Sequence, residues 1–130
     1  MKSTLAFALA AVALAAPGLG GTADAAAPTP ATRILLTVTS EATGDVTEVY
    51  LGCRPTGGNH PVAETACDEL QLANGDFDQL AGNADKACPM IYDPVTVTAV
   101  GTFNKVPVDW KKTFGNGCEL NAKTGHVFAF

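Results

Sequence analysis

The sequence predicts an α+β domain in which helix packs on one face of an antiparallel sheet. Three observations support this prediction. About five short runs are rich in β-branched and apolar residues and are separated by turns that contain glycine and asparagine. One main helical pattern lies between the second and third runs. Four cysteines follow an export signal, which favours disulfides in a small secreted domain.

The start of the 130-residue chain has the pattern of a secretory signal peptide. Lys2 supplies positive charge, and residues 5–16 form an apolar run too short to span a bilayer, so we expect no membrane partner. Ala23 and Ala25 fit a cleavage site, and a cut after Ala27 or a retained anchor are the alternatives. The expected organisation is a signal peptide at residues 1–25, a flexible arm at 26–33 and one domain at 34–130.

The charge and the cysteines exclude several classes of function. The net charge is -5 at pH 7 and no basic cluster is present, which argues against nucleic acid as a partner. Close pairs such as C-x-x-C are missing, so we expect no metal and no other cofactor. The residues alone leave open all three pairings of the four cysteines. These are Cys53, Cys67, Cys88 and Cys118.

The first two strands are predicted at residues 33–40 and 46–53, where β-branched residues are frequent. Gly44 and Asp45 form the turn between them, so the strands should be antiparallel neighbours. Residues 54–61 contain glycines and prolines and are predicted to form a loop.

The main helix is predicted to begin at Thr65, with Asp68 completing a capping box. It should run through Leu72 and end at Gly75, which can adopt the left-handed conformation. Residues 76–80 are expected to add one further helical turn.

The second half of the domain is predicted to contain a β-hairpin, with strands at residues 95–102 and 106–114 and a short connection at 103–105. The remaining predicted segments are a turn at 115–117, a turn at 123–125 and a closing apolar strand at 126–130.

The residues offer no assembled catalytic site. The two histidines, His60 and His126, are not near a serine nucleophile motif. We interpret His60 as a donor that fixes its loop and His126 as a strand-edge residue. Asp76 and Asp78 would point apart on a helix, so we interpret them as solvated or capping groups.

Residues 87–94 have the sequence Ala-Cys-Pro-Met-Ile-Tyr-Asp-Pro. Each proline fixes its own φ and favours an extended conformation in the residue before it, Cys88 or Asp93. A disulfide at Cys88 would tie this stiff segment to the rest of the chain. The apolar residues between the prolines either fill the core or are displayed to a protease. They are Met90, Ile91 and Tyr92.

A family resemblance favours the second interpretation. The residues Cys53-Arg54-Pro55, Gly58, His60-Pro61 and Ala66-Cys67-Asp68-x-Leu70 give the pattern C-x-P-x-x-G-x-H-P-x-x-x-x-A-C-D-x-L. This pattern resembles the signature of the Streptomyces subtilisin inhibitor family. Residues 87–94 resemble the family's reactive-site loop, and Val127-Phe128-Ala129-Phe130 is similar to its C-terminus.

The resemblance implies a secreted, extracellular and dimeric inhibitor of serine proteases, which is not an enzyme. It implies a five-stranded antiparallel sheet with two helices on one face and two disulfides, Cys53–Cys67 and Cys88–Cys118. It places the scissile bond between Met90 and Ile91. The protease-contact positions that it implies, from P4 to P2′, are Ala87, Cys88, Pro89, Met90, Ile91 and Tyr92.

The residues of the loop fit this role. Met90 is unbranched and adaptable, which suits the apolar specificity pockets of subtilisin-like and chymotrypsin-like enzymes, whereas a trypsin pocket favours Lys or Arg. We expect strong inhibition of subtilisin-like enzymes and weaker inhibition of chymotrypsin-like and trypsin-like enzymes. Ala87 is small and should make little contact at P4. Asn116, near Cys118, is a candidate donor to the loop carbonyls, and the alternative is an ordinary turn asparagine. Asp93 and Pro94 are expected to support the end of the loop.

Other functions stay open on the residues alone. One is a secreted interaction module in which the loop's apolar side chains fill the core. Another is a small secreted enzyme. A third is a substrate or inhibitor of another extracellular enzyme, such as a transglutaminase or a metalloprotease.

The predicted hairpin also bears on assembly. Its strands alternate apolar and other residues, and we expect the apolar set to form an exposed sheet face. Together with the resemblance, this predicts a two-fold homodimer through sheet faces that leaves both loops free. The set is Val95, Val97, Ala99, Val106, Val108 and Trp110.

Overall fold

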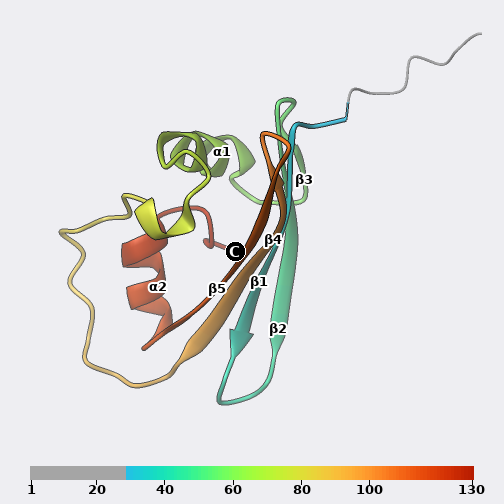
Figure 1. The fold of residues 1–130 in the computed structure, drawn as a ribbon. Helices are drawn as coiled ribbons and strands as arrows, with labels where there is room; N and C mark the ends of the chain where they lie inside the picture. Colours follow the sequence, from blue (N-terminus) through green and yellow to red (C-terminus); the bar gives the residue numbers. More distant parts are fainter. Residues whose placement is uncertain (1–28) are drawn as a thin grey trace, which may run out of the picture.

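The computed structural model describes residues 29–130. The expected signal peptide at 1–25 and the first part of the expected arm at 26–33 lie outside the described residues. Five strands form one antiparallel sheet in the order β3-β2-β1-β4-β5, and both helices cover the same face of it (Figure 1). The elements are β1 Thr32–Ser40, β2 Val46–Cys53, β3 Gly57–Gly58, α1 Ala63–Leu72, the 3-10 turn η1 Phe77–Gln79, β4 Val95–Phe103, β5 Val106–Phe114 and α2 Gly117–Thr124.

The predicted strands of the sheet are present with small changes at their ends. β1 begins at Thr32, so the sheet starts two residues before the domain boundary expected at 34. Phe103 pairs with Val106, which shortens the hairpin connection to Asn104 and Lys105. Both turn residues have positive φ, 46° and 68°, as a tight two-residue hairpin turn of type I′ requires.

The capping box predicted at Thr65 and Asp68 is wrong. Helix α1 begins at Ala63 after Val62, and no side chain caps it. The reason lies just upstream, because the buried ring of His60 accepts a hydrogen bond from Val62 N at 3.1 Å. This bond turns the chain into the helix before Thr65 is reached. The same ring donates from Nε2 to Val127 O at 2.8 Å, which confirms His60 as a loop-fixing donor.

The end of the chain differs from the prediction. The turn expected at 115–117 is the start of the second helix, α2. The strand expected at 126–130 is absent, and Val127 and Phe128 are instead buried in the core between the helices and the sheet. Phe128 lies 5.8 Å from Trp110 and 6.0 Å from Phe77, measured between ring centroids. An apolar segment of this length fits a core filler as well as a strand, and here its side chains complete the core.

The exposed apolar face predicted for the hairpin is also wrong. Val97 and Ala99 are fully buried under the helices, and Trp110 stacks on Phe77 of η1 at 5.2 Å. Val95 and Val108 also pack against this core, and of the predicted set only Val106 is exposed. The alternation was correct, but alternation alone does not say which face the helices cover.

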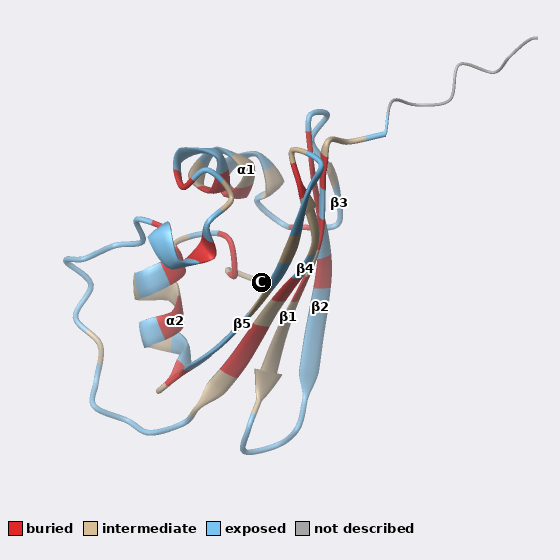
Figure 2. Ribbon diagram, in the orientation of Figure 1, coloured by how far each residue is buried: buried red, intermediate tan, exposed pale blue. Residues whose placement is uncertain are grey.

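The opposite sheet face is open to solvent along much of β2 and β5 (Figure 2). Leu35 lies at its centre and pairs with Tyr50 on one side and Val100 on the other. Tyr50 is 59% exposed and Val100 is 50% exposed. This row of three side chains is called the outer apolar row below. Among the described residues, no helix is both long and apolar enough to cross a bilayer.

Candidate functional site

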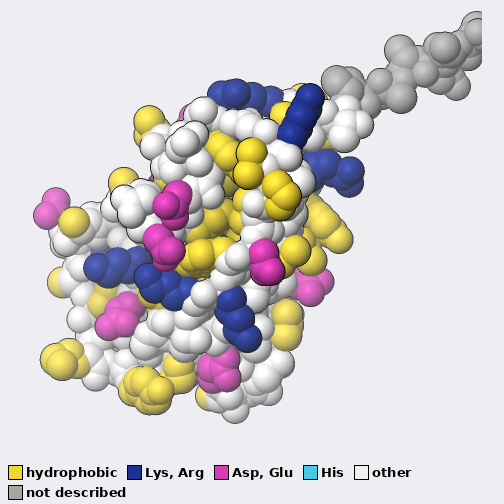
Figure 3. Space-filling model, viewed as in Figure 1, with side chains coloured by type: hydrophobic (Ala, Val, Ile, Leu, Met, Phe, Trp, Pro, Cys, Tyr) yellow, Lys and Arg dark blue, Asp and Glu magenta, His cyan; other side chains and the backbone are white. Residues whose placement is uncertain are grey.

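The 87–94 loop lies in the connection between η1 and β4, which runs around the outside of α2 (Figure 1). Its bulky side chains point away from the core, since Met90 is 104% exposed, Tyr92 85% and Ile91 61%. Hydrophobic side chains protrude along the lower edge of the molecule in Figure 3, where this connection runs in Figure 1. The interpretation in which these side chains fill the core is therefore wrong.

The inner side of the loop is held at three alternate residues. The side-chain amide of Asn116 donates to Ile91 O at 2.8 Å and to Pro89 O at 3.3 Å. Asp93 N donates to Gly115 O at 2.8 Å. Carbonyls of residues two apart point to the same side of an extended chain, so one side chain can bridge both. The backbone is thus fixed on both sides of the peptide bond between Met90 and Ile91.

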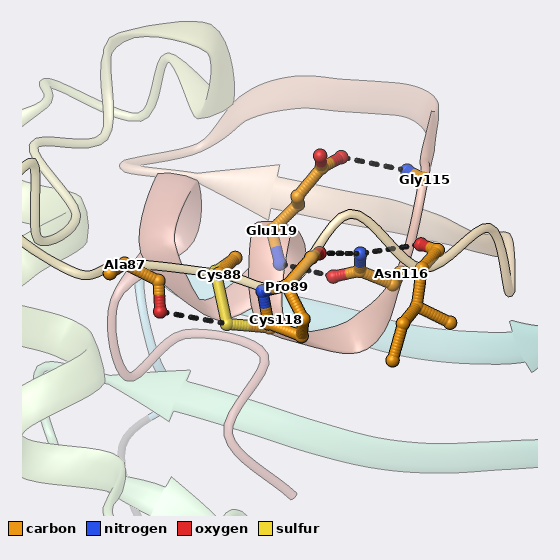
Figure 4. The surroundings of a disulfide bond; sticks show 8 residues. Ala87, Cys88, Pro89, Gly115, Asn116, Cys118 and Glu119 are labelled. Carbon is orange, nitrogen blue, oxygen red and sulfur yellow. Dashed lines mark hydrogen bonds between the residues drawn. A yellow bond between two sulfur atoms is a disulfide. The ribbon is translucent and has the colours of Figure 1, made fainter.

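Helix α2 sets the direction in which Asn116 points. Asn116 is the N-cap residue, and its Oδ1 accepts a hydrogen bond from Glu119 N at 2.8 Å (Figure 4). Because the amide oxygen is used by the helix, the NH₂ end is directed at the loop carbonyls. Asn116 is only 6% exposed, and the two hydrogen bonds that it donates to the loop are partly buried.

Glu119 also supports the loop, a role that is not among the predictions from the sequence. Its carboxylate reaches back past the N-cap and accepts a hydrogen bond from Gly115 N at 3.1 Å. Gly115 in turn holds Asp93 through its carbonyl, so Glu119 supports the far end of the loop. The spacing Asn-x-x-Glu at 116–119 is a capping-box pattern that could have revealed both this contact and α2.

A disulfide holds the near end of the loop. Cys88 is bonded to Cys118 in the first turn of α2, with Cα atoms 5.7 Å apart. The Ala87 O atom contacts the Cys118 sulfur at 4.0 Å. A disulfide sulfur carries no proton to donate, so the dashed line between these atoms in Figure 4 marks a contact only. The second disulfide, Cys53–Cys67, joins the end of β2 to α1. Both pairings are those that the resemblance implied.

The loop ends at a firm anchor on the sheet. Pro94 O accepts a hydrogen bond from Glu41 N at 3.0 Å, in the turn after β1. The Glu41 carboxylate accepts a hydrogen bond from the Thr96 hydroxyl at 2.5 Å. The Thr96 hydroxyl is also hydrogen-bonded to the Thr113 hydroxyl at 2.7 Å. Asp93 itself contributes its backbone N–H and leaves its side chain exposed. Pro94 is therefore the point at which the loop becomes strand β4.

The histidines lie in structural contacts away from this loop. His60 is hydrogen-bonded to Val62 N and Val127 O, and His126 contacts Glu69 through its backbone N and its Nδ1 atom. The interpretation of His126 as a strand-edge residue is wrong, because the last strand does not exist. Within residues 29–130, neither ring is hydrogen-bonded to a serine, threonine or cysteine side chain.

Comparison with known proteins gives consistent matches. The family model described as "Subtilisin inhibitor-like" matches residues 30–116. A subtilisin inhibitor from Streptomyces albogriseolus is 37% identical over 126 residues, covering 94% of this chain and 85% of the relative. Subtilisin inhibitor-like protein 5 from Streptomyces fradiae is 48% identical over 83 residues, covering 63% and 78%.

A solved structure agrees with these matches. Sermetstatin from Streptomyces caespitosus, crystallised in complex with Bacillus licheniformis subtilisin, aligns with a TM-score of 0.63 and 37% identity. The alignment covers 75% of this chain and 97% of sermetstatin.

Proposed function

Because the chain belongs to the subtilisin inhibitor-like family, we propose that it inhibits subtilisin-like serine proteases by presenting the 87–94 loop to their active sites as a substrate. One observation carries the proposal. Met90 is fully exposed at the apex of the loop, while the carbonyls of Pro89 and Ile91, before and after it, are held by one buried amide. A substrate-like strand that is already ordered loses little entropy on binding.

Met90 is assigned to the P1 position and Ile91 to P1′, so the bond between them is the reactive bond. The side chain of Met90 enters the protease's specificity pocket, and the neighbouring backbone pairs with the enzyme as an added strand. Ala87, at P4, contributes a single methyl group to this contact. Apolar specificity pockets accept Met90 better than trypsin's pocket does. We expect subtilisin to be inhibited more strongly than chymotrypsin or trypsin.

Slow hydrolysis follows from how the two sides of the reactive bond are held. When the protease serine attacks the Met90 carbonyl, the amine of Ile91 becomes the leaving group. The acyl side is kept in place by Cys88–Cys118 and by Pro89 O, and the amine side by Ile91 O and Asp93 N. A leaving amine that cannot diffuse away attacks the acyl-enzyme again at a high effective concentration. The reverse reaction then outruns hydrolysis.

The test of this function is a titration of purified protein against subtilisin, chymotrypsin and trypsin. Met90→Lys should shift the preference toward trypsin, because trypsin's pocket binds a cation. Met90→Asp should weaken subtilisin binding by about 2–4 kcal/mol, the scale of a central anchor residue. Since the side chain is fully exposed, neither change should alter the fold, which circular dichroism checks. A Met90→Asp variant with unchanged affinity would place the reactive site elsewhere.

The outer apolar row supports a second part of the proposal, a homodimer formed by two sheet faces. Leu35, Tyr50 and Val100 form this row on the open face of the sheet, opposite the helices. A two-fold contact there would cover the row and leave both 87–94 loops free. The sequence pattern at residues 1–25 and the two disulfides support export from the cell and an extracellular site of action.

A further inference from the structure

The exposed thioether of Met90 is chemically alone in the described part of the chain. The sequence contains two methionines, and the other is Met1. All cysteines of residues 29–130 are in disulfides, so no thiol there competes for an oxidant. Methionine sulfur reacts readily with peroxides where it is accessible, and Met90 is 104% exposed.

We propose that Met90 is an oxidation site that switches protease inhibition off. The inference rests on the proposed function, in which this side chain is the anchor in the protease pocket. The sulfur lone pair attacks one oxygen of hydrogen peroxide, an S–O bond forms as the O–O bond breaks, and the second oxygen leaves as water after taking up a proton. The sulfur is oxidised by two electrons to the sulfoxide, and the peroxide is reduced.

Oxidation of Met90 should change protease binding without changing the fold of the free protein. The Met90 side chain is fully exposed, so the added oxygen displaces no neighbour in the free protein. The contacts that order the loop use the backbone of Pro89, Ile91 and Asp93 and the Cys88–Cys118 disulfide. None of these involves the thioether. The oxidised protein should therefore keep its fold and the geometry of its loop.

Binding to the protease should become much weaker. A sulfoxide is polar, and an apolar specificity pocket offers its oxygen no hydrogen-bond donor. Burial of such an unpaired group should raise the inhibition constant about ten- to hundredfold. The linkage is reciprocal, so a bound protease should slow the oxidation of Met90.

The experiment compares untreated protein with protein oxidised by hydrogen peroxide to one added oxygen, located at Met90 by peptide mass spectrometry. Inhibition constants for subtilisin are measured before oxidation, after oxidation and after reduction with methionine sulfoxide reductases. We expect an increase of about ten- to hundredfold that the reductases reverse, and slower oxidation when subtilisin is present in excess. The matched control is Met90→Leu, which keeps an apolar side chain without sulfur. Whatever its starting inhibition constant, peroxide should leave that constant unchanged.

The outcomes distinguish this inference from the proposed function. If the untreated protein inhibits subtilisin and the protein carrying Met90 sulfoxide inhibits it equally well, the switch is wrong and the proposed function stands. If Met90→Leu loses as much inhibition on peroxide treatment as the unmodified chain, the relevant oxidation is elsewhere and the inference is again overturned. If the untreated protein does not inhibit subtilisin, both the proposed function and the switch fail.

Discussion

Replacement of Asn116 by serine separates the two tasks of this side chain. Serine is as good an N-cap as asparagine, so its hydroxyl can still accept the hydrogen bond from Glu119 N. Its side chain is too short to reach Pro89 O and Ile91 O, so the bridge across the bond between Met90 and Ile91, the proposed reactive bond, is removed. Asn116→Ser should leave α2 intact and release the loop.

The magnitude follows from the two bonds that are lost. Hydrogen bonds of this kind contribute about 0.5–1.5 kcal/mol each, and the one at 3.3 Å is the weaker of the two. Pro89 and Ile91 are exposed residues, so water can partly replace the amide. Loss of the two hydrogen bonds should lower the free energy that holds the loop in place by about 1–2 kcal/mol. The loop is then released about 5- to 30-fold more often. Hydrolysis of the reactive bond should accelerate by a similar factor.

The assay is a time course with catalytic amounts of subtilisin, in which mass spectrometry follows cleavage and residual protease activity reports inhibition. Asn116→Ala is the matched variant, because it loses the cap as well and should cost about 1 kcal/mol more in unfolding free energy. Denaturant unfolding of both variants checks this difference. An Asn116→Ser variant that is cleaved no faster than the unmodified chain would show that the amide bridge does not protect the reactive bond.

Other perturbations probe the remaining supports and the proposed dimer. Serine at both Cys88 and Cys118 should lower the unfolding free energy by about 3–4 kcal/mol, a scale consistent with their separation of 30 residues, and turn the protein into a substrate. A folded double variant that stays uncleaved and inhibitory for hours would contradict this. Glu119→Ala should speed cleavage about fivefold through loss of the bond to Gly115 N, and Glu119→Gln, whose amide oxygen can accept the same bond, should restore slow cleavage. Equal cleavage rates in the two variants would refute that role. Val100→Lys should convert a dimer to a monomer in light scattering with inhibition retained, and an unmodified chain that is monomeric at micromolar concentration would refute the proposed interface.

Much of the sheet could be predicted from the sequence, because its signals are local. β-Branched residues mark β1 and β4, and glycine or asparagine marks the turns. Such local signals do not predict which face of the sheet the helices cover. Val97 and Ala99 alternate with threonines, and this pattern shows that one side is apolar without saying whether helix or solvent lies over it.

The residues of the proposed site stand out in the sequence, but the geometry that holds them does not. The order of prolines and cysteine in the 87–94 loop indicated a stiff segment, and the family resemblance supplied its role. The bridge from Asn116 depends on α2, and the glycines at 115 and 117 favoured a turn over a helix start. The capping pattern with Glu119 pointed the other way. The capping pattern is the stronger indicator of a helix start, because its side chains accept hydrogen bonds from backbone N–H groups that have no partner within the helix.

Identification of the bond that subtilisin cuts first tests whether the reactive bond lies between Met90 and Ile91 and is protected by its supports. After prolonged incubation, we expect a single product with one added water molecule, still inhibitory and still one covalent species, because Cys88 and Cys118 lie on opposite sides of the cut. Reduction of the disulfides should then release two pieces, one ending at Met90 and the other beginning at Ile91. First cleavage at any other bond, or rapid digestion without inhibition, would show that the bond between Met90 and Ile91 is not a protected reactive bond.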